Sequence, residues 1–288
     1  MTKSKDTKFS AFSLLCRQKN ITYDKPVVMG ILNITPDSFY DGGSYTTEEL
    51  MLRRAHEILD QGADMIDIGA VSSRPGAILL PPEEERDRLV PAIKLLRSEF
   101  PDAVISVDTC YSLPAEAAIN SGADIINDIS GGQFDPNMIP AVAKMQVPYI
   151  LMHTRGLPGE MQRNTDYNDI IQEISSYFSE RLEQLYRLGG RDIILDPGFG
   201  FAKTLEQNYF LMNHLDDMIQ LFKEPFLVGI SRKSMIYKLL GNTPKESLNG
   251  TTFLNTISLE KGAAILRVHD VAEAVETVQL HNALHNPL

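Results

Sequence analysis

The side chains best suited to chemistry follow short apolar runs of the sequence. The run 225–230 stops at Ser231-Arg232-Lys233, so a strand there would carry two adjacent cations at its end. Seven other apolar runs stop at or beside polar groups, namely Asn33, Asp67, Asp108, Asn127, His153, Asp196 and Arg267. Helix capping accounts for a lone aspartate, but it does not require Lys233, Arg267 or His269. We therefore expect one polar pocket, lined by the ends of several strands.

The order of the expected elements predicts a barrel. Strand patterns occupy 27–33, 64–69, 103–108, 124–128, 147–152, 192–196, 225–230 and 264–268. Helical patterns separate them at 47–61, 83–99, 113–121, 136–145, 167–188, 205–221, 246–261 and 270–284. Glycines at 62, 122, 189 and 262 end a helix just before a strand, which is typical of repeated βα units. The sequence thus predicts an α/β protein with a single (β/α)8 TIM barrel. A doubly wound sheet is the alternative, but the Gly-x-Gly-x-x-Gly turn typical of its first strand is missing.

The first residues predict a small accessory element. We expect residues 1–24 to form a tail and a short β-hairpin, and residues 25–288 to form the catalytic barrel. The hairpin signals are the apolar 13–16, the polar 17–20 and the β-prone 21–23. Its expected role is to close the bottom of the barrel.

Composition narrows the class of partner. The 288-residue chain has a formal net charge of −11 and a pI near 5.0, which argues against nucleic acid because phosphate backbones need a surplus of Lys and Arg. Cys16 and Cys110 lack metal-type spacing and favour a reduced, cytoplasmic setting. The stretch 9–16 is too short and too mixed for a signal sequence or a membrane span, so we expect no membrane partner.

Several strand ends carry motifs of one family. Residues 29–39 read Met-Gly-Ile-Leu-Asn-Ile-Thr-Pro-Asp-Ser-Phe, and residues 67–76 read Asp-Ile-Gly-Ala-Val-Ser-Ser-Arg-Pro-Gly. Further motifs stand at 106–109, 126–129, 152–153, 196–203, 229–234 and 267–270. Together they resemble dihydropteroate synthases, in the family's order, from about residue 12 to 275. The first and last motifs are highly specific.

The resemblance implies a reaction and its requirements. The family joins 6-hydroxymethyl-7,8-dihydropterin diphosphate to p-aminobenzoate and releases pyrophosphate, in folate synthesis. It uses Mg2+ and a (β/α)8 barrel, usually as a homodimer, and sulfonamides compete for the p-aminobenzoate site. We place the expected dimer surface on the last helices, about 246–284.

The pterin would be bound by polar side chains inside the mouth. By resemblance, Asp196 accepts from the ring's amino group and adjacent N–H, the bidentate pairing that suits a carboxylate. Asn127 would donate and accept along the ring edge, and Asp108 would accept from another ring nitrogen. Lys233 would supply a cation to the carbonyl or imine side, and Met152 an apolar wall.

The diphosphate would be bound by cations. Arg267 and His269 alternate along one strand and therefore point to the same side. Ser73 and Arg74 would close over the anion, and Asn33 would be the protein ligand of Mg2+, with phosphate oxygens and waters completing the shell.

The arylamine needs a second, outer site. By resemblance the p-aminobenzoate pocket involves Ser234, Phe201, Pro36 and Ser73. Loss of diphosphate leaves a cation that the electron-rich ring stabilises, so the expected mechanism is dissociative and needs no enzymic nucleophile or strong base. Catalysis then rests on Arg267, His269, Lys233 and Mg2+, and Asp37 is expected to stabilise the cation.

Some residues depart from the family pattern. Val71 stands in place of a common Glu, Ser73 in place of Thr, and Ala202 in place of Gly. Sulfonamide sensitivity does not follow from the resemblance because Ser73 lacks a methyl group that could contact p-aminobenzoate.

Other noticeable residues are given structural interpretations. His153 has a structural or rim role at least as readily as a catalytic one. His56, His214, His281 and His285 share no spacing and are predicted to be surface groups, and Cys110 is predicted to fill space. The run Glu83-Glu84-Glu85 is predicted to be the first turn of a helix.

Three alternative functions remain. A methyltetrahydrofolate-binding methyltransferase module has similar pterin contacts, but it has no diphosphate to bind. A non-catalytic pterin-binding protein would not need every phosphate-side residue. A phosphate-binding barrel isomerase would not need Asp108, Asn127 and Asp196 together.

Overall fold

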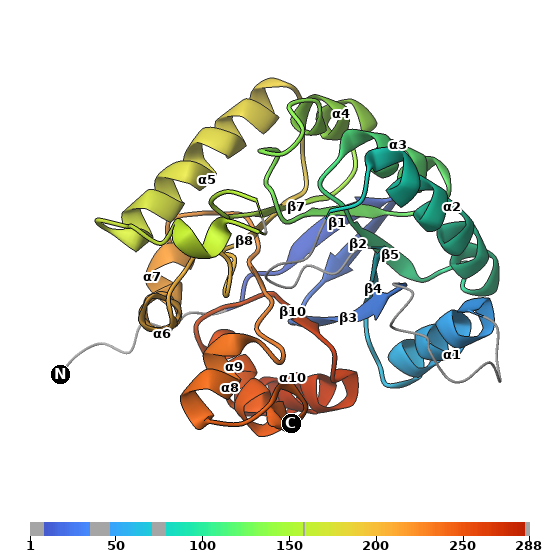
Figure 1. The fold of residues 1–288 in the computed structure, drawn as a ribbon. Helices are drawn as coiled ribbons and strands as arrows, with labels where there is room; N and C mark the ends of the chain where they lie inside the picture. Colours follow the sequence, from blue (N-terminus) through green and yellow to red (C-terminus); the bar gives the residue numbers. More distant parts are fainter. Residues whose placement is uncertain (1–8, 35–46, 71–78, 158, 286–288) are drawn as a thin grey trace.

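A ring of parallel strands organises the molecule, with helices around it (Figure 1). The computed structural model describes residues 9–34, 47–70, 79–157 and 159–285. The sheet order is β8-β7-β6-β5-β4-β3-β10-β9, and a parallel bridge between Leu195 and Phe226 joins the two ends of the sheet. The (β/α)8 barrel predicted from the sequence is confirmed.

The eight barrel strands are short and almost completely buried. They are β3 (Val27–Asn33), β4 (Met65–Gly69), β5 (Val104–Asp108), β6 (Ile125–Asp128), β7 (Tyr149–Met152), β8 (Ile193–Asp196), β9 (Leu227–Val228) and β10 (Ile265–Val268). Both faces of these strands are covered, which is why they read as runs of Val, Ile and Leu rather than as an alternating pattern. Each lies within one of the ranges predicted from the sequence.

The helices alternate with the strands. They are α1 (Thr47–Asp60), α2 (Pro82–Glu99), α3 (Ser112–Asn120), α4 (Met138–Met145), α5 (Ile170–Arg187), α6 (Leu205–Asn213), α7 (Leu215–Ile219), α8 (Ser234–Leu240), α9 (Leu248–Glu260) and α10 (Val271–His285). Short 3-10 turns lie at Met161–Arg163 and Pro244–Glu246. The glycines at 62, 122, 189 and 262 all have positive φ, as their predicted place after a helix requires.

One helical prediction differs from the structure. The range 205–221 is two helices, because the backbone at His214 (φ −108°, ψ 16°) leaves the helical region. Between β9 and β10, α8 begins at Ser234, where the sequence resumes a helical pattern, and ends at Gly241 in the left-handed conformation.

An antiparallel hairpin fills one end of the barrel. Its strands β1 (Phe12–Cys16) and β2 (Lys19–Tyr23) pair with each other and not with the barrel. Leu14, Cys16 and Tyr23 pack against the amino-terminal halves of the barrel strands, including Met29 and Met65. The hairpin is also bound by polar contacts, since Asp124 accepts from Arg17 and Asp192 accepts from the backbone N–H of Leu15. The hairpin therefore closes the end opposite the carboxyl-terminal mouth.

Candidate active site

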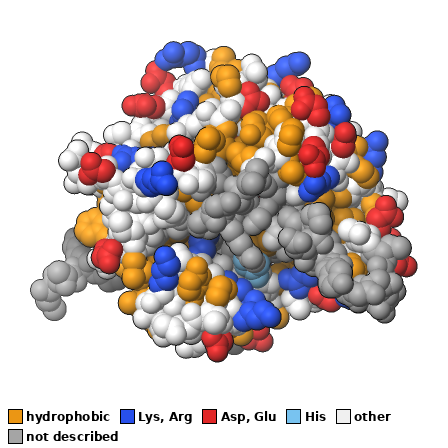
Figure 2. All heavy atoms as spheres, viewed as in Figure 1, with side chains coloured by type: hydrophobic (Ala, Val, Ile, Leu, Met, Phe, Trp, Pro, Cys, Tyr) orange, Lys and Arg blue, Asp and Glu red, His pale blue; other side chains and the backbone are white. Residues whose placement is uncertain are grey.

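The mouth of the barrel collects the ends of the strands. Figure 2 looks onto this face and shows a hollow near its centre, in which histidine and cationic side chains are visible. Asp108, Asp128, Met152 and Asp196 are the last residues of β5, β6, β7 and β8. Because parallel strands end at the same edge, side chains far apart in sequence meet here.

The centre of the mouth is an ion cluster around Arg267. The Arg267 guanidinium donates from Nε to Oδ2 of Asp67 at 2.7 Å and from Nη2 to Oδ2 of Asp108 at 2.9 Å. Asp67 also accepts from Ser106 Oγ at 2.6 Å and from Asn127 Nδ2 at 3.1 Å. These contacts connect four strands and fix the direction of the arginine.

The charges of this cluster influence one another. Burial raises the pKa of Asp108 to about 7, Arg267 opposes the rise and Asp67 adds to it. Burial alone would lower the pKa of Arg267, but Asp67 and Asp108 outweigh it and the pKa is raised. Arg267 therefore stays a cation, and burial makes Asp108 easier to protonate than an exposed aspartate.

A second charged pair lies beside the first. Asp196 is buried and accepts from the backbone N–H of Gly198 at 2.7 Å. Burial raises the pKa of Asp196, and the positive charge of Lys233 opposes the rise. Burial lowers the pKa of Lys233 to about 8, and Asp196 opposes the fall. Lys233 Nζ also donates to the carbonyl oxygen of Phe199 at 2.6 Å, so the amine is fixed at the wall of the mouth.

The conformation of the turn before Lys233 determines the orientation of that side chain. Arg232 has a φ of +55°, a left-handed backbone that is costly for a residue with a Cβ. Its backbone N–H donates to Thr251 Oγ1 at 3.1 Å and its Nε donates to Asp270 Oδ2 at 2.9 Å. The bidentate pair with Asp270 thus stabilises an unfavourable conformation immediately before the proposed pterin-binding lysine.

An apolar wall lies beside these polar groups. Met152 and Phe201 belong to one buried cluster with Cys110, Ile129, Met161 and Ala202. Lys233 Nζ stands 4.6 Å from the centre of the Phe201 ring, so the wall reaches the cationic side of the mouth. Ala202 has a φ of +48°, a left-handed backbone that favours glycine, so alanine is strained here. Cys110 fills space as predicted.

His269 belongs to the same mouth but faces a different partner. Its Nδ1 and its backbone N–H both lie 3.1 Å from Ser231 Oγ. Ser234 is partly exposed at the first position of α8, and Asn33 is partly buried at the end of β3. Pro36, Asp37, Ser73 and Arg74, together with Val71, lie outside the described residues.

Sequence reasoning missed a buried lysine under the mouth. Lys203 Nζ donates to the carbonyl oxygens of Gly198 and Phe201, at 2.9 and 3.0 Å, and lies 3.3 Å from Nδ1 of His153. Burial lowers the pKa of Lys203 to about 7 and keeps that of His153 well below its usual range. The lysine connects Gly198 and Phe201 and so stabilises the loop that carries Phe201. Its position as the last residue of the motif 196–203 is the one sequence feature that could have indicated this role.

Of two other interpretations, one is confirmed and one needs correction. Glu85 lies in the first turn of α2 as predicted, and it is in addition 3% exposed, so that burial raises its pKa to about 7. His281 was predicted to be a surface group, but it is 9% exposed and lies beside His285. The two histidines are four residues apart on α10, a spacing that puts them on one face of the helix.

Comparison with known proteins agrees with this geometry. The family model described as "Pterin binding enzyme" matches residues 29–269. A dihydropteroate synthase of Synechocystis sp. is 44% identical over 260 residues, covering 89% of this chain and 89% of the relative. That of Escherichia coli (strain K12) is 39% identical over 272 residues, covering 94% and 95%. The solved Xanthomonas albilineans dihydropteroate synthase with 4-aminobenzoic acid has a TM-score of 0.89 at 36% identity, covering 97% of this chain and 100% of that chain.

These matches span nearly the whole barrel, from its first strand to the residue that follows its last strand. The chain therefore belongs to the family of pterin-binding enzymes. Within that family it is an enzyme of the dihydropteroate synthase type, a transferase of folate synthesis. Among the described residues, no helix has both the length and the apolar character needed to cross a lipid bilayer.

Proposed function

We propose that this chain condenses 6-hydroxymethyl-7,8-dihydropterin diphosphate with p-aminobenzoate to 7,8-dihydropteroate and pyrophosphate, with the residues assigned below. The observation that carries the proposal is the arrangement of Asp108, Asn127 and Asp196 around one mouth, with Arg267 and Lys233 between them. A methyltransferase module would have no diphosphate for these cations. Solved relatives hold 4-aminobenzoic acid in one case and 7,8-dihydropteroate in another.

The pterin ring is bound at the floor of the mouth. Asp196 presents a carboxylate to the amino group and the neighbouring N–H, while Asn127 binds the ring edge. Asp108 accepts from a further ring nitrogen, and its pKa of about 7 makes this contact sensitive to pH. Lys233 faces the carbonyl or imine side, and Met152 packs on a face of the ring.

The diphosphate lies against Arg267 and His269. Asp67 fixes the guanidinium and Ser231 fixes the imidazole, so both donors are oriented before the substrate arrives. Ser73 and Arg74 contribute further donors to the diphosphate. Orientation in advance matters because negative charge develops on the leaving group as the C–O bond breaks.

A magnesium ion fits the residues at the end of β3. The Asn33 side chain offers an amide oxygen, the hard donor that Mg2+ prefers, and the substrate phosphates and waters would supply the remaining ligands. When bound, Mg2+ would neutralise charge on the diphosphate. Arg267 and His269 bind the same group from the protein side.

The chemical step is a dissociative displacement. The methylene C–O bond breaks, the pyrophosphate leaves with the bonding electrons, and the ring delocalises the resulting positive charge. The neutral arylamine nitrogen then forms the new C–N bond and releases a proton to solvent. Asp37 stabilises the cation, so Asp37→Asn is expected to lower kcat, and unchanged turnover would remove Asp37 from the mechanism.

The arylamine occupies the outer part of the mouth. Ser234 contributes a hydroxyl to its carboxylate, while Phe201 contacts the ring together with Pro36 and Ser73. Ser234 is partly exposed whereas Asn127 and Asp196 are buried, which suits a site nearer to solvent than the pterin floor.

The assembly we propose is a cytoplasmic homodimer. Five large apolar side chains on neighbouring helices α8, α9 and α10 are more than half exposed, namely Leu239, Leu240, Phe253, Leu280 and Leu284. Such a surface suits a self-association interface. Phe253→Glu should convert the dimer to a monomer in light scattering, and an unchanged mass would move the interface elsewhere.

The experiment that tests the reaction measures pyrophosphate release from dihydropterin diphosphate, with Mg2+, with and without p-aminobenzoate. Release with formation of dihydropteroate supports the proposal. Tight pterin binding without release would instead indicate a non-catalytic binding protein.

Paired lysine variants test the assigned site. Lys233→Met should lower kcat/KM about 10–150-fold, because a hydrogen bond to a charged group contributes about 1.5–3 kcal/mol. Lys261→Met is the matched control, since Lys261 contacts Asp216 and Asn213 near the end of α9. Equal effects of the two substitutions would contradict the site.

A further inference from the structure

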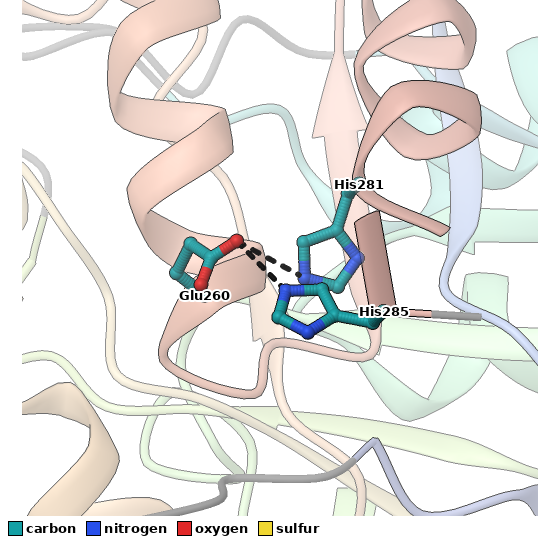
Figure 3. Close-up of side chains that lie close together, drawn as sticks. All are labelled: Glu260, His281 and His285. Atoms are coloured by element: carbon teal, nitrogen blue, oxygen red, sulfur yellow. Dashed lines mark hydrogen bonds and ion pairs between the residues drawn. The ribbon is translucent and has the colours of Figure 1, made fainter. Parts of the chain in front are cut away.

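Three potential metal ligands meet on the last two helices of the barrel, away from the mouth. Glu260 is the last residue of α9, while His281 and His285 lie on the last two turns of α10 (Figure 3). Both helices run back from the mouth, so their last turns lie at the opposite end of the barrel. The proposed reaction uses none of these residues.

The distances suit one small ion. Glu260 Oε1 lies 3.0 Å from His285 Nε2 and 3.7 Å from His281 Nε2. Zn2+ binds nitrogen and oxygen at about 2.0–2.2 Å, so two ligands of a tetrahedral ion stand roughly 3.4 Å apart. One ligand atom from each residue lies within 4.8 Å of the others. Small side-chain rotations would bring all three to one ion.

His281 is not explained as an ordinary buried histidine. It is 9% exposed, and its Nδ1 is buried without a hydrogen-bond partner among the described residues. The other ring nitrogen, Nε2, faces Glu260 Oε1 at 3.7 Å, so Nε2 is the atom offered to an ion.

Other histidines of the chain provide a contrast. His56 pairs with Glu99 at 3.2 Å and His214 pairs with Asp217 at 3.1 Å. Each of these pairs is partly or fully exposed. Within the part of the chain that the structure describes, no third histidine, cysteine or carboxylate completes a metal-binding group around either pair.

We propose that Glu260, His281 and His285 bind one divalent transition-metal ion of the zinc class, with water completing its shell. Two imidazoles and one carboxylate favour Zn2+, Co2+ or Ni2+ over Mg2+, which prefers oxygen ligands. The bound ion connects the end of α10 to the end of α9 and so stabilises the docking of the C-terminal helix on the barrel.

The test is a titration of tag-free protein with Co2+ and Zn2+ in the presence of excess Mg2+. Visible absorption of Co2+ reports coordination by nitrogen, and calorimetry with Zn2+ gives affinity and stoichiometry. We expect one ion per chain. At a hundredfold excess over Kd, the ion should also raise Tm by about 4–5 °C.

Variants assign the ligands. His285→Ala and Glu260→Gln change exposed or half-exposed side chains, so both proteins should fold. Loss of an outer-shell partner alone costs about 10–100-fold in metal affinity, so loss of a ligand should cost at least about a hundredfold. His56→Ala is the matched control and should bind the ion like the parent chain.

Each remaining outcome overturns the proposal. These outcomes are an absence of Co2+ absorption bands, unchanged affinity in His285→Ala and Glu260→Gln, and a loss of binding in His56→Ala equal to theirs. Displacement of the ion by Mg2+ would also contradict it. Since binding and Tm are measured without substrates, failure here leaves the proposed synthase reaction untouched, and the reverse also holds.

Discussion

Asp67 accepts a hydrogen bond from Arg267, the arginine that we propose binds the diphosphate, and the neutral isostere Asp67→Asn tests what this contact contributes. Asp67→Asn keeps the shape of the side chain but removes the carboxylate that accepts from Arg267, Ser106 and Asn127. The amide offers one acceptor oxygen in place of two. Its NH2 group would therefore face a hydrogen-bond donor where the second carboxylate oxygen accepts in the parent chain.

The expected loss of stability follows from those contacts. A hydrogen bond to a charged group contributes about 1.5–3 kcal/mol, and removal of one partner from a buried ion pair costs about 3–5 kcal/mol. Asp108 still pairs with Arg267 at 2.9 Å, so the lower part of that range applies, about 3 kcal/mol. For a chain of this length, that corresponds to a fall in Tm of roughly 5 °C.

The assay combines urea unfolding with steady-state kinetics. The matched control is Ser106→Ala, which removes one hydrogen bond at 2.6 Å from the same carboxylate and should cost about 1–2 kcal/mol. We expect Asp67→Asn to lower kcat more than it raises KM, because Arg267 loses its orientation but keeps its charge. An Asp67→Asn protein as stable and as active as the parent would refute the view that this carboxylate positions Arg267.

Three further predictions concern the scaffold. Leu14→Ala should cost about 2–5 kcal/mol in urea unfolding, because Leu14 is 1% exposed inside the closed end of the barrel; a smaller cost than at an exposed leucine such as Leu188 would contradict this. Glu85 has a pKa raised from 4.5 to about 7 in the folded chain, so the native state binds more protons in that window and stability should fall as pH rises through it. Glu85→Gln should flatten that part of the stability–pH curve by on the order of 1–3 kcal/mol, and an unchanged slope would assign the titration to another group. Gly198→Ala should reduce both stability and pterin binding, because the new Cβ would lie 2.0 Å from the His153 carbonyl oxygen at a φ of +71°. Isothermal titration with the pterin measures the affinity, and an unchanged affinity would show that the substitution is tolerated.

The barrel could be predicted from the sequence because its signals are local. Each buried strand is a run of β-branched and aliphatic residues, and glycines such as Gly62 and Gly262 mark where a helix must stop. The separation of α6 from α7 was not predicted, because the residue pattern around His214 does not indicate the end of a helix. The bounds of the hairpin were correct to within two residues at each strand.

The site was predicted in part, for a physical reason. Strand ends could be listed from the sequence, but the partner of each charge depends on which ends face one another across the ring. Arg267 meets Asp67 across 200 positions of the chain, and Lys203 meets His153 across 50. The burial of Glu85 could not be predicted, because it arises beside Thr109 and Asp128, residues distant in the sequence that no local pattern connects to it.

The closed end of the barrel has a consequence for kinetics. With Leu14 and Tyr23 filling that end, substrates and products share one entrance. Asn127 and Asp196 lie buried at its floor, while Ser234 lies nearer to solvent. A molecule seated at the outer position would obstruct the inner one, so the pterin should bind first and an arylamine that arrives early should act as a dead-end inhibitor. Turnover would then follow a compulsory order of binding, because the barrel is open at one end only.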